Sequence, residues 1–295
     1  MKDVSIIIVS YNTKDILQKC IQSIYDSVIS AAFEIIVVDN ASLDGSSEMI
    51  KNEFKEIILI ENKENIGFAA ANNMGIKKSE GSFLLFLNSD TNVYRGSVDV
   101  VLTFLKNNST TGAATCRVEL PDGKIDDASH RGFPTPWNSF SHFSGLSRMF
   151  PKTKIFAGYS LGHLDTSINH EIDACAGAYM MVRRVAGEQV GWWDEDYFFY
   201  GEDIDFCYRL RQTNWEIWYV PSVKILHYKG VSGGIKEISK DITTADSETK
   251  QRSTQARFEA MKIFYQKHYS QKYPKFITWI TLAGINVKKT ITKLG

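Results

Sequence analysis

The stretch that decides the fold is Val4-Ser5-Ile6-Ile7-Ile8-Val9, which is followed at once by Ser10-Tyr11-Asn12-Thr13. The first six residues are mostly β-branched and apolar, as in a parallel strand that is buried on both faces. The next four are residue types that favour turns and helix N-termini. Apolar residues then recur at helical spacing from Ile16 to Ile24, which predicts a strand, a turn and a helix.

The same alternation continues to about residue 90. Further strands are predicted at 34–38, 57–61 and 83–87, with helical patterns between them. We therefore expect an α/β fold with a doubly wound parallel sheet and right-handed crossovers. Ligands of such sheets bind beyond the carboxyl ends of the strands. Polar clusters follow three of these strands and predict a binding site there, although ordinary turns use the same residue types.

The rest of the chain is less regular. Pro121-Asp122-Gly123 predicts a hairpin turn, and residues 133–149 predict a long loop. Strand character returns over 173–183 and over 216–220, where Pro221 is expected to end the strand. From about residue 236 the composition becomes polar and then amphipathic, which predicts a helical extension.

The composition excludes some classes of protein. The 295 residues carry a formal net charge of zero, whereas an electrostatic nucleic-acid binder carries a basic surplus. No signal peptide is recognised, and no run of about 18 apolar residues predicts a spanning helix. The four cysteines form no CxxC pair, so buried free thiols are expected rather than disulfides or a zinc site.

An acidic cluster follows an aromatic run in the second half of the chain. Phe198-Phe199-Tyr200-Gly201 leads into Glu202-Asp203-Ile204-Asp205, where a helical pattern begins. Carboxylates at a helix N-terminus are stabilised by the helix dipole. This placement suits a general base at the rim of a pocket, and the alternative is an acidic helix cap on a solvated face.

Several familiar site motifs are absent. The first strand is not followed by GxGxxG, which disfavours a Rossmann dehydrogenase, and there is no P-loop, serine nucleophile elbow or HExxH. The strand ends instead offer Asp39 and Asp90. Their oxygens suit the hydroxyls and amides of a nucleotide, or Mg²⁺ or Mn²⁺.

These segments together resemble the family-2 inverting glycosyltransferases, which have the nucleotide-diphospho-sugar transferase (GT-A) fold. The resemblance covers about residues 3–235 and rests on five segments in order: Ser5–Asn12, Val37–Ser46, Asn65–Ala69, Leu87–Asp90 and Tyr200–Asp203. It implies a mostly parallel central sheet flanked by helices. A catalytic domain over 1–235, with a nucleotide-binding half (1–106) and an acceptor half (107–235), would precede a C-terminal helical appendage over 236–295.

The resemblance also implies a role for each matching residue. Asp203 would be the catalytic base, and Glu202 would orient the acceptor or Asp203. Asp90 and His227 would hold Mg²⁺ or Mn²⁺, although Asn88 replaces the first acid of the usual Asp-x-Asp motif and a lone histidine is often a packing residue. The nucleotide would be bound by residues at the strand ends: Ser10, Tyr11, Asn12, Asp39, Asp44, Asn65, Gly67, Asn88 and Ser89.

Three further residues are predicted beside the sugars. Gly177 lies in a small-residue segment where the donor sugar would approach the backbone. Trp192 and Trp193 would form an acceptor platform, with core packing as the alternative. Arg183 and Arg184 would contact a diphosphate or would simply be surface charges.

The segment His227–Gly234 and the Asn-Ser-Asp variant at 88–90 are most similar to bacterial rhamnosyltransferases of cell-surface polysaccharide assembly. The implied donor is dTDP-L-rhamnose, and the implied acceptor is a glycan on a polyprenyl-diphosphate carrier. Two alternatives stay open: transfer of another hexose from a UDP-sugar, and a non-catalytic nucleotide-sugar or glycan-binding module on the same fold.

The C-terminal segment mixes aromatic, aliphatic and basic residues. Phe276, Trp279, Ile280, Ile285 and Val287 lie between Lys272 and Lys275 on one side and Lys288, Lys289 and Lys293 on the other. Such a helix suits the surface of an anionic leaflet, here the cytoplasmic face of the inner membrane, which would make the protein cytoplasmic and peripheral. The alternatives are packing on the catalytic domain or on a second subunit, as a homodimer.

Overall fold

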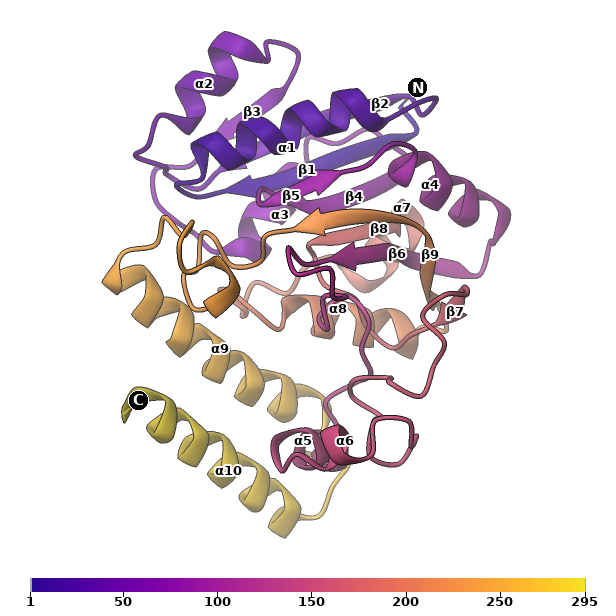
Figure 1. Cartoon of the computed structure of the whole chain (residues 1–295), viewed down its shortest axis with the longest axis vertical. Coiled ribbons are helices and arrows are strands. Elements are labelled where there is room, and N and C mark those ends of the chain that lie inside the picture. The colour runs from indigo at the N-terminus through magenta and orange to yellow at the C-terminus, as the bar shows by residue number, and fades with distance from the viewer. Residues whose placement is uncertain (1, 295) are drawn as a thin grey trace.

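The computed structural model describes residues 2–294, with side chains up to Thr292, so the side chain of Lys293 lies outside the described part. The centre is a nine-stranded sheet in the order β3-β2-β1-β4-β8-β6-β9-β5, with β7 paired to β9. In Figure 1, α9 and α10 lie together at the end of the molecule away from α1 and α2, beside the α5–α6 segment.

The first half of the chain forms the predicted parallel sheet. Strands β3, β2, β1 and β4 are parallel neighbours. The elements are β1 (Val4–Ser10), α1 (Lys14–Ser27), β2 (Phe33–Asp39), α2 (Ser46–Glu53), β3 (Ile58–Glu61), α3 (Phe68–Ile76) and β4 (Phe83–Asn88). Ile6 and Ile8 pack on one face of the sheet and Ile7 on the other, and all three are fully buried. This two-sided burial is why β1 is apolar throughout.

The second half continues the sheet with mixed strand directions. Strand β8 is antiparallel to β4 and β6, β6 is parallel to β9, and β5 and β7 are antiparallel to β9. The elements are β5 (Thr91–Val93), α4 (Ser97–Asn107), β6 (Thr111–Glu119), α5 (Pro136–Phe143), α6 (Leu146–Met149), β7 (His170–Glu171), β8 (Tyr179–Arg183), α7 (Arg184–Val190), α8 (Glu202–Gln212), β9 (Glu216–His227), a 3₁₀ turn (Glu237–Ser239), α9 (Ser247–His268) and α10 (Lys275–Leu294).

Two sequence predictions are wrong in this half. Strand β9 does not end before Pro221, because the partner register jumps from Cys116↔Val220 to Arg117↔Lys224. The proline therefore sits in an irregularity where its missing N–H is tolerated. The predicted long loop contains α5, which begins at Pro136 after Thr135 accepts a hydrogen bond from the Asn138 N–H. Proline at the first helical position is a favourable start.

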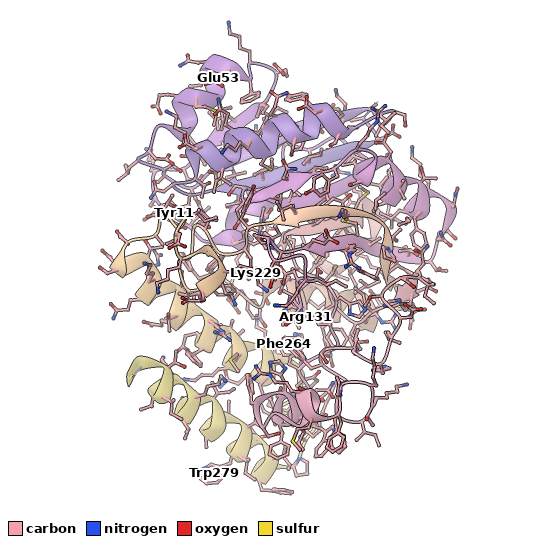
Figure 2. The ribbon with its side chains drawn as sticks, in the orientation of Figure 1. Tyr11, Glu53, Arg131, Lys229, Phe264 and Trp279 are labelled. Carbon is pink, nitrogen blue, oxygen red and sulfur yellow. The ribbon has the colours of Figure 1, made fainter. Side chains whose placement is uncertain are left out.

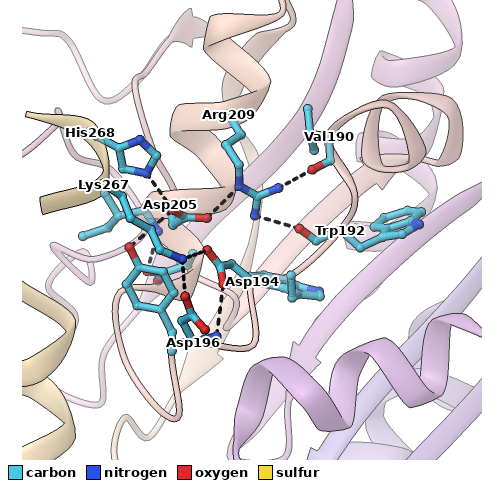
Figure 3. Close-up of polar contacts among 12 residues, drawn as sticks. Val190, Trp192, Asp194, Asp196, Asp205, Arg209, Lys267 and His268 are labelled. Carbon is cyan, nitrogen blue, oxygen red and sulfur yellow. Dashed lines mark hydrogen bonds and ion pairs between the residues drawn. The ribbon is translucent and has the colours of Figure 1, made fainter. Parts of the chain in front are cut away.

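The C-terminal helices are fastened to the rest of the structure through α8 and the loop before it. His268 of α9 contacts Asp205 Oδ1 at 2.7 Å, and Arg209 donates to Asp205 Oδ2 at 2.7 Å (Figure 3). Lys267 pairs with Asp194 and, at 2.7 Å, with Asp196. Asp205 is fully buried and paired, so its role is structural, and a cap on a solvated face does not describe it.

The face of α10 that points away from α9 is apolar and open. Trp279 is 72% exposed and Ile291 is 65% exposed. The inner side meets α9 through Lys289 and Glu259 at 3.0 Å. Within residues 2–294, no helix combines the length and the apolar character needed to cross a membrane.

Candidate active site

The loops that follow β1, β2 and β4 are tied together by their own polar side chains. Thr13 Oγ1 lies 3.0 Å from Ser10 Oγ and donates to Ser89 Oγ at 3.1 Å. Asn12 Oδ1 accepts from the Leu43 N–H at 2.7 Å, and Asp44 Oδ2 accepts from the Lys14 N–H at 2.7 Å. These contacts shape the edge of the sheet at which ligands of doubly wound folds bind.

A cleft of about 830 Å³ opens at this edge and runs on to the C-terminal helices. In Figure 2, Tyr11 marks its upper end, Lys229 and Arg131 its middle, and Phe264 its side on α9. The cleft brings together many of the predicted site residues from distant parts of the chain: Tyr11, Asn65, Gly67, Asn88, Ser89, Asp90, Gly177, Glu202, Asp203 and His227.

Gly67 joins the nucleotide side of the cleft to the acidic helix. Its backbone has φ +89°, and a Cβ there would lie 2.5 Å from the carbonyl oxygen of Phe198. The next N–H, of Phe68, donates to that carbonyl at 2.8 Å. Only glycine permits this approach, and the contact places the 198–201 turn, from which α8 begins, against the start of α3.

Asp203 lies in the first turn of α8 and is held at both carboxylate oxygens. Oδ1 accepts from the Ile204 N–H at 2.7 Å, and Oδ2 accepts from Arg131 Nη2 at 2.6 Å. The side chains of Arg131 and Asp203 are 11% and 13% exposed. Desolvation of the buried guanidinium disfavours its charged form, but the attraction of Asp203, together with Tyr159 and Cys207, outweighs that cost and raises the pKa of Arg131.

Glu202 lies beside Asp203 in a different state. It is buried, and its Oε2 has no hydrogen-bond partner among the described residues. Burial, and then the charge of Asp203, raise the pKa of Glu202 to about 8. Of these two neighbouring carboxyl groups, Glu202 is the one whose environment favours the protonated form.

Asp90 and His227 meet because β5 pairs with the end of β9, with Thr91 opposite His227. Asp90 Oδ1 lies 3.2 Å from His227 Nε2, and Asp90 Oδ2 accepts from the backbone N–H groups of Gly230 and Val231 at 3.0 and 3.2 Å. The other ring nitrogen, Nδ1, lies 2.8 Å from Asp126 Oδ2. Burial disfavours the imidazolium, but Asp90 and Asp126 outweigh it and raise the pKa of His227 to about 9.

The donor set at this point fits a divalent cation. In metal sites a carboxylate on Nδ1 of a histidine fixes the ring so that Nε2 can bind the metal. Asp126 holds Nδ1 of His227 in this way, and Nε2 faces Asp90. Protein ligands alone would be few, since no group of three or more His, Cys, Asp or Glu side chains suited to a metal occurs in the described part of the chain. Mg²⁺ commonly binds through one or two carboxylates and completes its shell with phosphates and water.

Several predicted residues do not line the cleft. Ser10, Asn12 and Asp44 make the loop contacts given above. Asp39 is buried behind the lining and accepts from the Ser42 N–H at 3.0 Å, while its Oδ1 has no partner within the described part. Oδ1 is therefore the oxygen of Asp39 that is still able to accept a hydrogen bond.

The predicted tryptophan platform is corrected by the structure. Trp193 is 2% exposed and stacks on Phe206, with their ring centroids 5.0 Å apart. Trp192 packs against the same core cluster, and neither residue lines the cleft. Both rings therefore belong to the core, which was the alternative to an acceptor platform. Arg183 and Arg184 likewise donate to backbone carbonyls rather than facing the cleft.

Sequence reasoning missed two residues of this site. Arg131 and Asp126 lie in a region without regular pattern, and each reaches its partner across the fold, 72 residues from Asp203 and 101 residues from His227. The Asp126-Asp127 pair just after the hairpin is the only local signal. Nothing near Arg131 distinguishes it from a surface arginine.

Comparison with known proteins identifies the family. The model of glycosyl transferase family 2 matches residues 5–172, and that of glycosyl transferase family group 2 matches residues 136–256. The chain is 28% identical to the N-acetylglucosaminyl-diphospho-decaprenol L-rhamnosyltransferase of Mycobacterium tuberculosis, over 68% of each protein. It is 26% identical to the rhamnosyltransferase WbbL of Escherichia coli, over 76% of this chain and 83% of WbbL.

Solved structures agree on the fold. The mannosyltransferase PcManGT of Pyrobaculum calidifontis matches all of this chain and 89% of its own length, with a TM-score of 0.55 at 16% identity. GalNAc-T7 matches 77% of this chain with a TM-score of 0.58 at 18% identity, and the match spans 44% of that protein. These neighbours are GT-A glycosyltransferases. With the expected fold confirmed and a family model covering more than half of its length, the chain belongs to glycosyl transferase family 2.

Proposed function

We propose that this chain is an inverting glycosyltransferase that moves L-rhamnose from dTDP-L-rhamnose to a hydroxyl group of a lipid-linked or polysaccharide acceptor in cell-envelope glycan synthesis. The observation that carries the proposal is the convergence of Asp203, Asp90 and His227 on one cleft. The names of the M. tuberculosis and E. coli relatives support rhamnose as the sugar.

The reaction is a single displacement. The acceptor hydroxyl gives its proton to Asp203 while its oxygen forms a bond to the anomeric carbon of the donor. The bond from that carbon to the diphosphate breaks on the opposite face, and the diphosphate leaves with the electron pair. One base is enough, because inversion needs no nucleophilic residue.

Chain residues around the base would prepare this step. Arg131 holds one carboxylate oxygen of Asp203 at 2.6 Å and so limits the directions from which the acceptor hydroxyl can approach. Glu202 is protonated at neutral pH, given its raised pKa of about 8, so it can donate a hydrogen bond to an acceptor oxygen. Tyr11, Asn65 and Gly67 line the nucleotide end of the same cleft.

Asp90 and His227 are the residues that would hold Mg²⁺ or Mn²⁺, with Asp126 fixing the ring of His227. A divalent cation there would supply charge stabilisation for the leaving diphosphate. GalNAc-T7 and PcManGT are described with Mn²⁺, which supports a metal of this type. The backbone N–H groups on Asp90 keep its second oxygen occupied and its orientation constant.

Two other functions remain open as alternatives. The Haloferax volcanii relative, 28% identical over 78% of this chain, is a glycan-biosynthesis hexosyltransferase, so the donor could instead be a UDP-hexose. A binding module without catalysis would need no base. The described cleft contains Asp203 with a dedicated arginine partner, which favours the enzyme.

The exposed apolar face of α10 supports a location on a membrane surface. We place the chain on the cytoplasmic leaflet, where apolar residues such as Trp279 and nearby lysines would meet anionic lipids. Contact with a second copy through the same helices is the alternative. The division into a catalytic domain over 1–235 and an extension over 236–295 belongs to the same proposal.

The test uses the whole chain, a panel of nucleotide sugars and Mg²⁺ or Mn²⁺. We expect transfer from dTDP-L-rhamnose, and we expect Asp203→Asn to lower the rate by about 10²–10⁴-fold, because a general base contributes that much. Donor binding, measured by calorimetry, should stay near that of the parent. Asp122→Asn, in the exposed hairpin, is the control. Transfer from UDP-hexoses alone would overturn the rhamnose assignment, and undiminished turnover in Asp203→Asn would remove Asp203 from the mechanism.

A further inference from the structure

Four cationic side chains face the part of the cleft that the mechanism above does not use. They are Lys236, Arg252, Arg257 and Lys288, here called the cationic cluster, and all four line the cleft. Arg252 and Arg257 belong to α9 and Lys288 to α10. Their positions put positive charge on the C-terminal extension rather than at the strand ends of the catalytic body.

The cationic cluster has no counter-charge of its own. Within the described side chains, no ion pair or hydrogen bond to a carboxylate involves any of the four. Two of them rest on aromatic rings: Arg252 lies 4.0 Å from the centroid of Phe198, and Lys288 lies 3.9 Å from that of Phe143. Other cations of the molecule, such as Lys289 and Lys267, are paired with carboxylates.

Arg257 opposes the charges of two other members of the cationic cluster. Burial, and then the charge of Arg257, lower the pKa of Lys236 to about 8. Burial and Arg257 also lower the pKa of Lys288. The hydroxyl of Tyr200 is buried in the same lining without a hydrogen-bond partner in the described part. Unpaired cations and an unsatisfied hydroxyl around one space are the arrangement that a phosphate completes.

An apolar trench continues the cleft from the cationic cluster. It is lined by Phe140 and Phe143 of α5, Phe264 of α9, and Ile280, Gly284 and Ile285 of α10. Phe140 is 57% exposed and Ile280 is 55% exposed, so the trench reaches the surface between α5 and α10. Figure 2 places Phe264 between Arg131 and Trp279. The trench therefore leads from the catalytic carboxylates towards the open apolar face of α10.

We propose that the cationic cluster binds the phosphate or diphosphate of a lipid-linked acceptor, and that the first part of its hydrocarbon chain lies in the apolar trench. The inference rests on the proposed function, because it assigns the acceptor side of that site. A nucleoside diphosphate carries no hydrocarbon chain and gives no account of the trench. An amphiphile with an anionic head and an apolar tail matches both parts of the cleft.

The probes are farnesyl diphosphate, inorganic diphosphate and farnesol, and binding to the full chain is measured by calorimetry without donor. We expect farnesyl diphosphate to bind more tightly than either fragment. Arg257→Gln and Lys288→Gln should each weaken it by about tenfold, the effect of one lost charge-assisted contact. Lys289→Gln is the matched control, since Lys289 neighbours Lys288 but pairs with Glu259 at 3.0 Å. It should bind as the parent does.

A second variant tests the trench by filling it. A Cβ added at Gly284 meets no atom within 4 Å, and leucine favours a helix more than glycine does, so Gly284→Leu is expected to fold. It should weaken farnesyl diphosphate by about tenfold through lost apolar contact, and it should leave inorganic diphosphate binding unchanged. Circular dichroism of each variant checks the fold.

Two results would overturn the inference. One is unchanged farnesyl diphosphate binding in Arg257→Gln and Lys288→Gln. The other is competition between farnesyl diphosphate and dTDP, with both weakened by the same substitutions, which would assign the cationic cluster to the donor. The proposed function can fail separately from this inference. If the substitutions in the cationic cluster weaken lipid diphosphate binding but no donor supports sugar transfer, the transferase function is rejected and the lipid diphosphate site is kept. If the chain transfers sugar to a water-soluble acceptor and does not bind farnesyl diphosphate, the site is rejected and the transferase function is kept.

Discussion

Arg131 Nη2 lies 2.6 Å from Asp203 Oδ2, and the two residues are 72 positions apart in the chain. Arg131 reaches this point because its backbone pairs with Ala174, with N–O distances of 3.2 and 3.0 Å. The other oxygen of Asp203 accepts from the Ile204 N–H. Both oxygens of the candidate base are therefore oriented by the protein before an acceptor arrives.

Arg131→Met should lower kcat by about 10²-fold, because a misplaced base loses much of its contribution. Donor binding should not change. Arg131→Lys keeps the positive charge but loses the planar guanidinium group, so its kcat should lie between those of the parent and Arg131→Met. A parent-like kcat in Arg131→Met would show that the pair only supports the fold.

Glu202→Gln should change how stability depends on pH. The pKa of Glu202 is raised to about 8 in the folded chain against 4.5 for the ordinary group. The folded state therefore binds the proton more tightly, and the free energy of unfolding of the parent falls as pH rises from about 4.5 to 8. The variant lacks this titrating group, so its free energy of unfolding should rise relative to that of the parent by on the order of 1–3 kcal/mol between pH 5 and pH 8. Urea unfolding at both pH values measures it, and parallel curves would contradict it.

Gly67→Ala should destabilise the chain more than Gly123→Ala does. Both glycines have positive φ, at +89° and +80°, but an added Cβ lies 2.5 Å from Phe198 O at Gly67 and meets nothing within 4 Å at Gly123. The conformational strain of about 1 kcal/mol is shared, and the clash adds to it only at Gly67. Thermal unfolding of both variants compares them. Equal losses of stability in the two variants would mean that the turn before α8 can move away from α3 at no cost.

Trp279→Ser and Ile291→Ser should each reduce binding to vesicles that contain phosphatidylglycerol by about tenfold, because burying one such side chain contributes about 1.5–3 kcal/mol. The two residues are 72% and 65% exposed on α10. Leu43→Ser, at a site that is 94% exposed in the catalytic body, is the control. Vesicle flotation measures the effect. Unchanged flotation together with a shift from dimer to monomer in sedimentation would assign this face to a second copy.

The first half of the fold could be predicted from sequence because its signals are local. The apolar run at Ile6–Ile8 predicts a strand buried on both faces, and the polar residues that end each strand share one edge of a parallel sheet. The acidic helix start at Glu202 is equally local, since glycine at the N-cap and carboxylates in the first turn are both visible in the chain. The order of these short segments along the chain was then enough to indicate the glycosyltransferase family.

The tertiary structure alone decided which side chains meet. Arg131 and Asp126 carry no local signal, because their partners are supplied by α8 and β9 from far along the chain. Trp193 is a residue type that often stacks on sugars, but it packs against Phe206 and therefore lies in the core. Pro221 is tolerated only because its partner strand skips register there. Periodicity within a segment sets local structure and burial, while pairing between distant segments depends on the packing of the whole chain.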